Sequence, residues 1–128
     1  GRGWAPMNRR QTAPWPIPPD AQQQHQTKHG YHQVKYTWRQ AGWRYEARWH
    51  ERIPKAKLIT WPSWRLDRIR PGIGYGPHAQ PRLAETRVGD CWLPLRRVRY
   101  AAVRYNHGQA TAKDIHLLKA AHPAPVVR

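Results

Sequence analysis

The chain has 128 residues, the size of one small domain. It carries 23 Lys and Arg against 7 Asp and Glu, a formal net charge of +16. This excess points to a polyanionic partner, most commonly nucleic acid. No apolar run of about 18 residues is present, so we expect no membrane anchor.

Cysteine and aromatic content narrow the class of protein further. A single cysteine, Cys91, excludes an intrachain disulfide and a cysteine-rich zinc site. Eight Trp and six Tyr, with no Phe, suit the core of a small β-rich domain, and both side chains also stack well on bases. The chain begins with Gly and lacks an apolar signal segment, so we expect a domain cut from a longer protein.

The first 24 residues contain repeated Pro and three consecutive Gln. Repeated Pro disfavours both helix and interior strand, so the pattern predicts an extended arm or linker over residues 1–24. A basic domain is then expected over residues 25–128.

Two segments of alternating character follow the arm, residues 31–38 and 43–52. They predict two antiparallel strands joined by a four-residue loop over residues 39–42. Both strands then place their aromatic residues on one face. On the other face the expected register puts Lys35 opposite Glu46, and Tyr31 opposite His50.

The rest of the chain predicts shorter strands and then helices. Strands are expected over residues 58–61, 64–70 and 82–88, with loops between them. Helical spacing of Leu95, Val98, Ala102 and Tyr105 follows Pro94, and Thr111 with Asp114 forms a capping box for a second short helix. The expected fold class is α+β, a small twisted antiparallel sheet of three to five strands with two short C-terminal helices.

Metal-independent RNA cleavage needs a base for the 2′-OH, an acid for the leaving 5′-oxygen, and cations for the phosphorane. On one strand face, Glu46 and His50 supply a base and an acid, with Arg48 between them as a phosphate ligand. Strand geometry separates Glu46 from His50 by roughly 13 Å. Lys35 and Tyr31 are expected to support this site from the neighbouring strand. The alternative interpretation is a plain Lys35–Glu46 ion pair on a solvated sheet face.

Three histidines, His25, His29 and His32, lie just before and within the first strand. Three imidazoles can bind zinc, but no carboxylate is adjacent, so we expect no metal and no cofactor. His29 or His32 is instead a second candidate acid or base, and His32 on the aromatic face is expected to be buried. Further candidates for nucleic-acid binding are basic residues, namely Lys28, Arg44, Arg96, Arg97, Arg99 and Arg104.

Two stretches carry a family resemblance: KHGYHQVKYTW with GWRYEARWHERIP, and VGDCWLP with HGQATAKDIHLLKAAHPAP. In this order they resemble a C-terminal toxin domain of bacterial polymorphic toxin systems, polymorphic toxin type 30. The family pattern falls on Lys28, His29, Tyr31, His32, Tyr36, Glu46, Arg48 and His50, and on Gly108, Thr111 and His122. The chain departs from the family in lacking a Pro after Thr111, which bears on helix capping.

The resemblance implies an RNase domain, carried on a secreted protein and delivered into the cytoplasm of a competitor cell. It also implies a cognate immunity protein in the producing cell. We expect this partner to be acidic, and the toxin to be a monomer that acts on RNA. Two other hypotheses stay open: a structural RNA-binding protein of the ribosomal kind, and a DNase or zinc-dependent nucleic-acid-modifying toxin using the histidine cluster.

Overall fold

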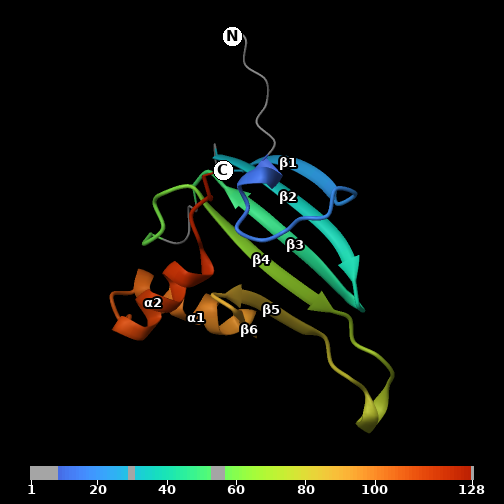
Figure 1. The fold of residues 1–128 in the computed structure, drawn as a ribbon. Helices are drawn as coiled ribbons and strands as arrows, with labels where there is room; N and C mark the ends of the chain where they lie inside the picture. The colour runs from blue at the N-terminus through green and yellow to red at the C-terminus, as the bar shows by residue number, and fades with distance from the viewer. Residues whose placement is uncertain (1–8, 29–30, 53–56, 128) are drawn as a thin grey trace.

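The computed structural model describes residues 9–28, 31–52 and 57–127 and shows a six-stranded antiparallel sheet with two helices (Figure 1). The strands are β1 (Gln22–Lys28), β2 (Tyr31–Gln40), β3 (Trp43–His50), β4 (Ser63–Arg70), β5 (Leu83–Val88) and β6 (Cys91–Pro94). They lie in the sheet in chain order. The helices are α1 (Leu95–Asn106) and α2 (Ala112–Ala121), with short 3-10 helices η1 (Arg9–Thr12) and η2 (Gly76–His78). The predicted α+β class is confirmed, with one strand more than the expected maximum.

The β2–β3 hairpin has a two-residue loop, Ala41 and Gly42, so the predicted four-residue loop is wrong. Both loop residues have positive φ, 51° and 81°, the signature of a type I′ turn. The backbone twist of a type I′ turn matches the right-handed twist of the two strands. Strand pairing therefore continues to Gln40 and Trp43, two residues further along β2 than the sequence predicted. The register moves by two positions: Lys35 faces Arg48 instead of Glu46, and Gln33 instead of Tyr31 faces His50. A shift of two preserves which residues share a face.

One face of the sheet, the aromatic face, carries the larger core. Trp64 is fully buried at its centre, with ring centroids of Trp49, Tyr36 and Trp15 at 5.6, 6.1 and 6.2 Å. Val34, Ala47 and Leu66 complete this buried layer. His32, expected among these residues, is exposed, because it lies near the end of β2 beyond the segment that covers the core.

Residues before β1 cover this aromatic face. Ala13 and Ile17 are buried in its core, and Thr12 Oγ1 accepts a hydrogen bond from Trp64 Nε1 at 3.3 Å. The described part of the predicted arm therefore packs on the domain, and its expected boundary at residue 24 falls inside β1. Repeated Pro prevents regular structure here but still allows apolar side chains between the prolines to be buried.

The two helices lie against the opposite face at the β5–β6 end of the sheet (Figure 1). Val98 and Ala101 of α1 pack with Leu118 and Ala121 of α2, and Val88 of β5 joins them. The predicted capping box at Thr111 is confirmed, with Asp114 N donating to Thr111 Oγ1 at 3.2 Å. The main contacts of the helices with the sheet are to β5 and β6. We call the face of the sheet on the side of the helices the polar face, because it carries Glu46, Arg48 and Asp67.

Two details of the predicted elements are wrong. Residues 58–61 form no strand, and β4 begins at Ser63, directly after Pro62. Residues Cys91–Pro94, for which no strand was predicted, form β6, which pairs with β5 through the Gly89–Asp90 turn. Cys91 is exposed and reduced.

The hairpin tip generates a stability prediction. Ala41 holds a left-handed backbone conformation that glycine adopts freely, so Ala41→Gly should raise the free energy of unfolding by about 0.5–1 kcal/mol. Gly42→Ala should lower it by about 1 kcal/mol through backbone strain alone, because a Cβ there meets nothing within 4 Å. Urea unfolding of both variants measures these changes. Destabilisation by Ala41→Gly would contradict the observed turn.

Candidate active site on the polar face

Two neighbouring strands place three cross-strand pairs of polar residues on the polar face. Strand β3 contributes Glu46, Arg48 and His50, the E-x-R-x-H pattern of the sequence. Strand β4 mirrors it, so that Asp67 faces Glu46, Arg65 faces Arg48 and Ser63 faces His50. Alternation along each strand puts all six side chains on one side of the sheet.

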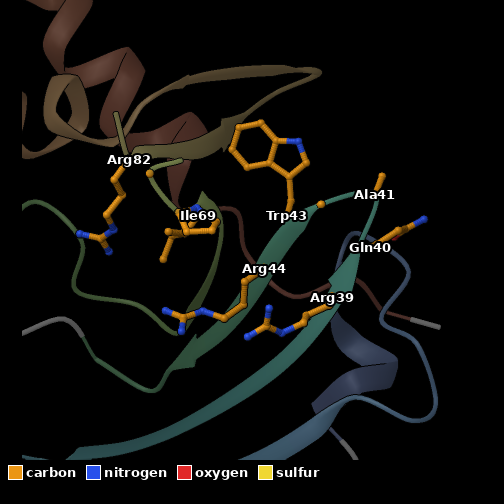
Figure 2. Close-up of a pocket in the computed structure, with 10 residues that line it drawn as sticks. Arg39, Gln40, Ala41, Trp43, Arg44, Ile69 and Arg82 are labelled. Atoms are coloured by element: carbon orange, nitrogen blue, oxygen red, sulfur yellow. The ribbon is translucent and has the colours of Figure 1, made fainter. Parts of the chain in front are cut away.

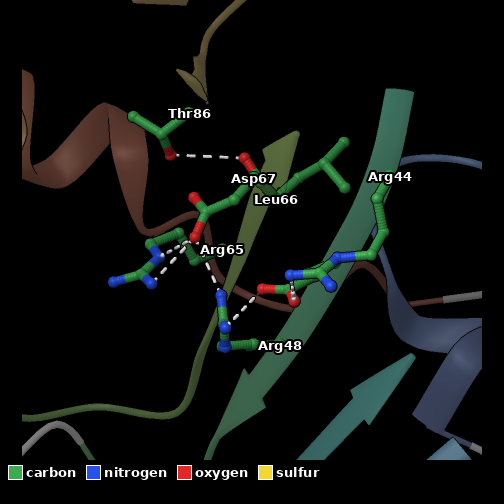
Figure 3. A network of polar contacts seen from close by, with 7 residues as sticks. Arg44, Arg48, Arg65, Leu66, Asp67 and Thr86 are labelled. Atoms are coloured by element: carbon green, nitrogen blue, oxygen red, sulfur yellow. Dashed lines mark hydrogen bonds and ion pairs between the residues drawn. The ribbon is translucent and has the colours of Figure 1, made fainter. Parts of the chain in front are cut away.

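Arg48 lies between the two carboxylates and donates hydrogen bonds to both (Figure 3). Its Nη1 lies 2.8 Å from Asp67 Oδ2, and its Nη2 bonds Glu46 Oε2. Arg65 donates to the same Asp67 oxygen from Nε at 3.1 Å and Nη2 at 2.8 Å. Arg44 completes the network at 3.1 Å from Glu46 Oε1. Each carboxylate is thus paired with two guanidinium groups, which offsets the cost of burying it.

These groups line a cleft of about 220 Å³ between the sheet and α1. Glu46 and Asp67 are only 5% and 2% exposed, so they form the bottom of the cleft. The lining contains five arginines against these two acids: Arg44, Arg48, Arg65, Arg82 and Arg99. The net excess of positive charge is suited to holding a phosphate group.

Two further cavities continue from this cleft across the polar face. One, of about 870 Å³, shares Arg44 and Glu46 with it and reaches Lys35 on β2. The other, of about 630 Å³, lies at the hairpin tip, where Arg39, Arg44 and Arg82 extend to one side and Trp43 to the other (Figure 2). Basic side chains therefore line the polar face from the hairpin tip to the helices.

At the other end of the array the polar side chains are buried. His50 is 8% exposed and His122, the residue that ends α2, is 5% exposed. Burial lowers the pKa of His50 to about 4, helped by the nearby Arg65 and Arg48. Burial also lowers the pKa of His122 to about 3, with further repulsion from Arg65 and His50. Both histidines are therefore neutral at pH 7.

The predicted supporting residues do not gather around His50. The Tyr31 hydroxyl accepts a hydrogen bond from Arg52 at 3.1 Å, and the Arg52 guanidinium lies over its ring. Lys35 is half-buried in the wide cavity and faces Arg48. His32 is exposed, while His29 and the Lys28 side chain lie outside the described residues.

The helix arginines expected to bind nucleic acid do not share one surface. Arg99 lines the cleft beside Glu46, whereas Arg97 lines a groove between the two helices. Arg104 forms a bidentate pair with Asp114, both bonds 2.8 Å long, and this pairing lowers the pKa of Asp114. Arg96 is exposed on α1. Arg99 is thus the one helix arginine of these four that reaches the candidate site in the described structure.

The structure adds three residues that sequence reasoning missed, Ser63, Arg65 and Asp67, and it brings His122 into the same cluster. The signal available for the first three was the S-x-R-x-D pattern of β4. Like E-x-R-x-H in β3, it alternates polar residues around a central arginine, but its acid stands at the other end, as an antiparallel neighbour requires. His122 had no such signal, since its place depends on how α2 docks. In the described part of the chain no group of His, Cys, Asp and Glu side chains could hold a metal ion.

Comparison with protein-family models, curated proteins and solved structures found no significant match. No described helix combines the length and apolar character needed to cross a bilayer. The function must therefore be inferred from the site itself.

The buried histidines predict acid sensitivity. Both pKa values are lower in the folded state than the ordinary 6.5, so the unfolded chain binds more protons. Stability should thus be fully present above about pH 6.5 and fall as the pH drops toward 4. Urea unfolding in buffers from about pH 7.5 to about pH 4 measures how the free energy of unfolding changes with pH.

The matched variants are His122→Gln and, as control, the exposed His116→Gln. His122→Gln should flatten the pH dependence of the unfolding free energy, while His116→Gln should leave it unchanged. Equal slopes in all three proteins would show that His122 is not held neutral by burial.

Proposed function

We propose that the protein is a metal-independent endoribonuclease that cleaves RNA by attack of the 2′-OH on the adjacent phosphate. The observation that carries this proposal is the position of Glu46 at the bottom of a cleft lined by five arginines. A carboxylate acts as a base on a hydroxyl, and the surrounding guanidinium groups attract the phosphate that lies beside that hydroxyl. The remaining basic residues of the polar face support binding of the flanking chain.

Glu46 and Arg48 act at the reacting phosphate, and Arg65 and Lys35 support them. Glu46 removes the 2′-OH proton, and Arg48, which already bridges both carboxylates, turns toward the phosphate oxygens as they become more negative. Arg65 holds Asp67 and so keeps Arg48 in position from the neighbouring strand. Lys35 binds a flanking phosphate from β2.

His50 is the proposed donor of the proton to the leaving 5′-oxygen. It is neutral in the free protein because of burial and two nearby arginines. A bound phosphate adds negative charge beside those arginines, which raises the pKa of the imidazole and allows it to carry a proton. The product would end in a 2′,3′-cyclic phosphate.

The proposed biological setting is a toxin delivered into the cytoplasm of competing bacteria. A cognate acidic immunity protein would then cover the polar face in the producing cell. The formal charge of +16 and the exposed arginines support fast, electrostatically steered association with such a partner.

The central prediction concerns three substitutions along the polar face of β3. Glu46→Gln, Arg48→Ala and His50→Ala should each lower the rate of RNA cleavage by about 10²-fold or more, because each removes one chemical role. The measurement is cleavage of total bacterial RNA in excess EDTA, with the 3′ ends of the fragments tested for cyclic phosphate. Glu51→Gln, which changes an exposed carboxyl just after β3, is the matched control and should keep full activity.

Other results of this assay would distinguish between the competing functions. Activity within a few-fold of wild type in all three variants would overturn the site assignment. Cleavage that EDTA abolishes would favour a metal-dependent nuclease. Salt-sensitive RNA binding with no cleavage would favour a structural RNA-binding protein.

A further inference from the structure

The aromatic face carries a second, separate feature beyond the edge of its core. Two indoles and three guanidinium groups alternate in one stack, in the order Arg70, Trp43, Arg68, Trp92 and Arg87, which we call the Arg–Trp ladder. The Arg68 guanidinium carbon lies 4.2 Å from the Trp43 ring centroid and 4.3 Å from that of Trp92. The outer arginines, Arg70 and Arg87, lie 5.4 Å from Trp43 and 5.6 Å from Trp92.

An aromatic pair extends the ladder toward β2. Trp38 and Tyr45 are stacked, with centroids 5.4 Å apart and planes inclined by 5°. Tyr45 then meets the edge of Trp92 at 5.9 Å. All of these residues are half-buried, so each ring presents part of its surface to solvent.

The ladder lies beside the buried core and not within it. Residues before β1 cover the half of the aromatic face that contains Trp64, and the buried core cluster includes none of the five ladder residues. Trp92 is partly buried and packs against that cluster from outside it. One arginine between the two indoles and two outside them thus keep positive charge beside partly exposed aromatic rings at the molecular surface.

The ladder has an excess of positive charge, which favours an anionic ligand. Arg68 is paired with Glu85 at 2.7 Å, whereas Arg87 approaches the exposed Asp90 only at 3.9 Å. Three arginines therefore face two carboxylates, one of them weakly. Unpaired bases stack on indole and guanidinium planes, and their phosphates are attracted by the same cations. A base pair inside a duplex offers no free ring face to this surface.

We propose that the Arg–Trp ladder binds unpaired bases of single-stranded RNA. This inference deepens the proposed function, on which it rests, by naming single-stranded RNA as the substrate class. Trp43 connects the two sites, because it belongs to the ladder and also lines the hairpin-tip cavity with Arg39 and Arg44 (Figure 2). A strand stacked on the ladder reaches the catalytic cleft by crossing the hairpin tip.

The test is binding of a fluorescent single-stranded 2′-O-methyl RNA, which cannot be cleaved through its 2′ position, and of the matched duplex. Trp43→Leu should weaken single-strand binding about 10-fold and change duplex binding less than about 2-fold, because only free bases stack. Trp43→Phe keeps an aromatic plane and should restore most of the affinity. Trp61→Leu, at a Trp that is 36% exposed and outside the ladder, is the control.

Each outcome decides the inference. Unchanged single-strand binding by Trp43→Leu, or equal losses for single strand and duplex, would overturn it. Displacement of the RNA by polyglutamate with equal ease from wild type and from Trp43→Leu would show that charge alone holds the RNA, and it would also overturn the inference. Trp43-dependent binding without any cleavage of natural RNA would retain the ladder and reject the nuclease.

Discussion

Burial of Trp64 is the constraint on which the rest of this structure depends. Its indole fills the centre of the aromatic core and bonds Thr12, while its backbone N–H donates to Pro123 O at 2.8 Å. One residue thus ties the N-terminal segment, the sheet and the C-terminal segment together. Because side chains alternate along a strand, fixing Trp64 on one face fixes Ser63 and Arg65 on the other. The bond to Pro123 likewise holds the preceding His122 over the end of the polar array.

Without Glu46 and Asp67, the arginines of the polar face would repel one another and destabilise the sheet. Arg48 and Arg65 are direct cross-strand neighbours, a like-charge arrangement that destabilises a sheet. Asp67 reverses this by accepting from both, and Glu46 satisfies the remaining side of Arg48. Folding stability alone would be served by fewer charges at this place. Arginines in excess of their counter-ions in one cleft are instead typical of a surface selected for anion binding.

The sequence predicted the features that depend on alternation of side chains along a strand. It did not predict the contacts that depend on how the helices pack on the sheet. The faces of β2 and β3 were predictable because strand parity survives a register error of two residues. The loop length was not, since Ala41 gives no signal for a positive φ. Glu46, Arg48 and His50 were predicted to share a face, and they do. The clustering of His50 with His122 was not predictable, because it depends on tertiary packing of α2.

Strand β1 has a consequence for handling the protein in solution. It is an edge strand, its sequence QQQHQTK carries one formal charge, and no described strand pairs with its outer side. Such an edge can template pairing with another copy of itself. The net charge of +16 opposes this self-association through repulsion, and salt screens that repulsion. Ionic strength therefore has two separate effects: it releases bound polyanions, and it screens the repulsion that keeps the edge strands of different molecules apart.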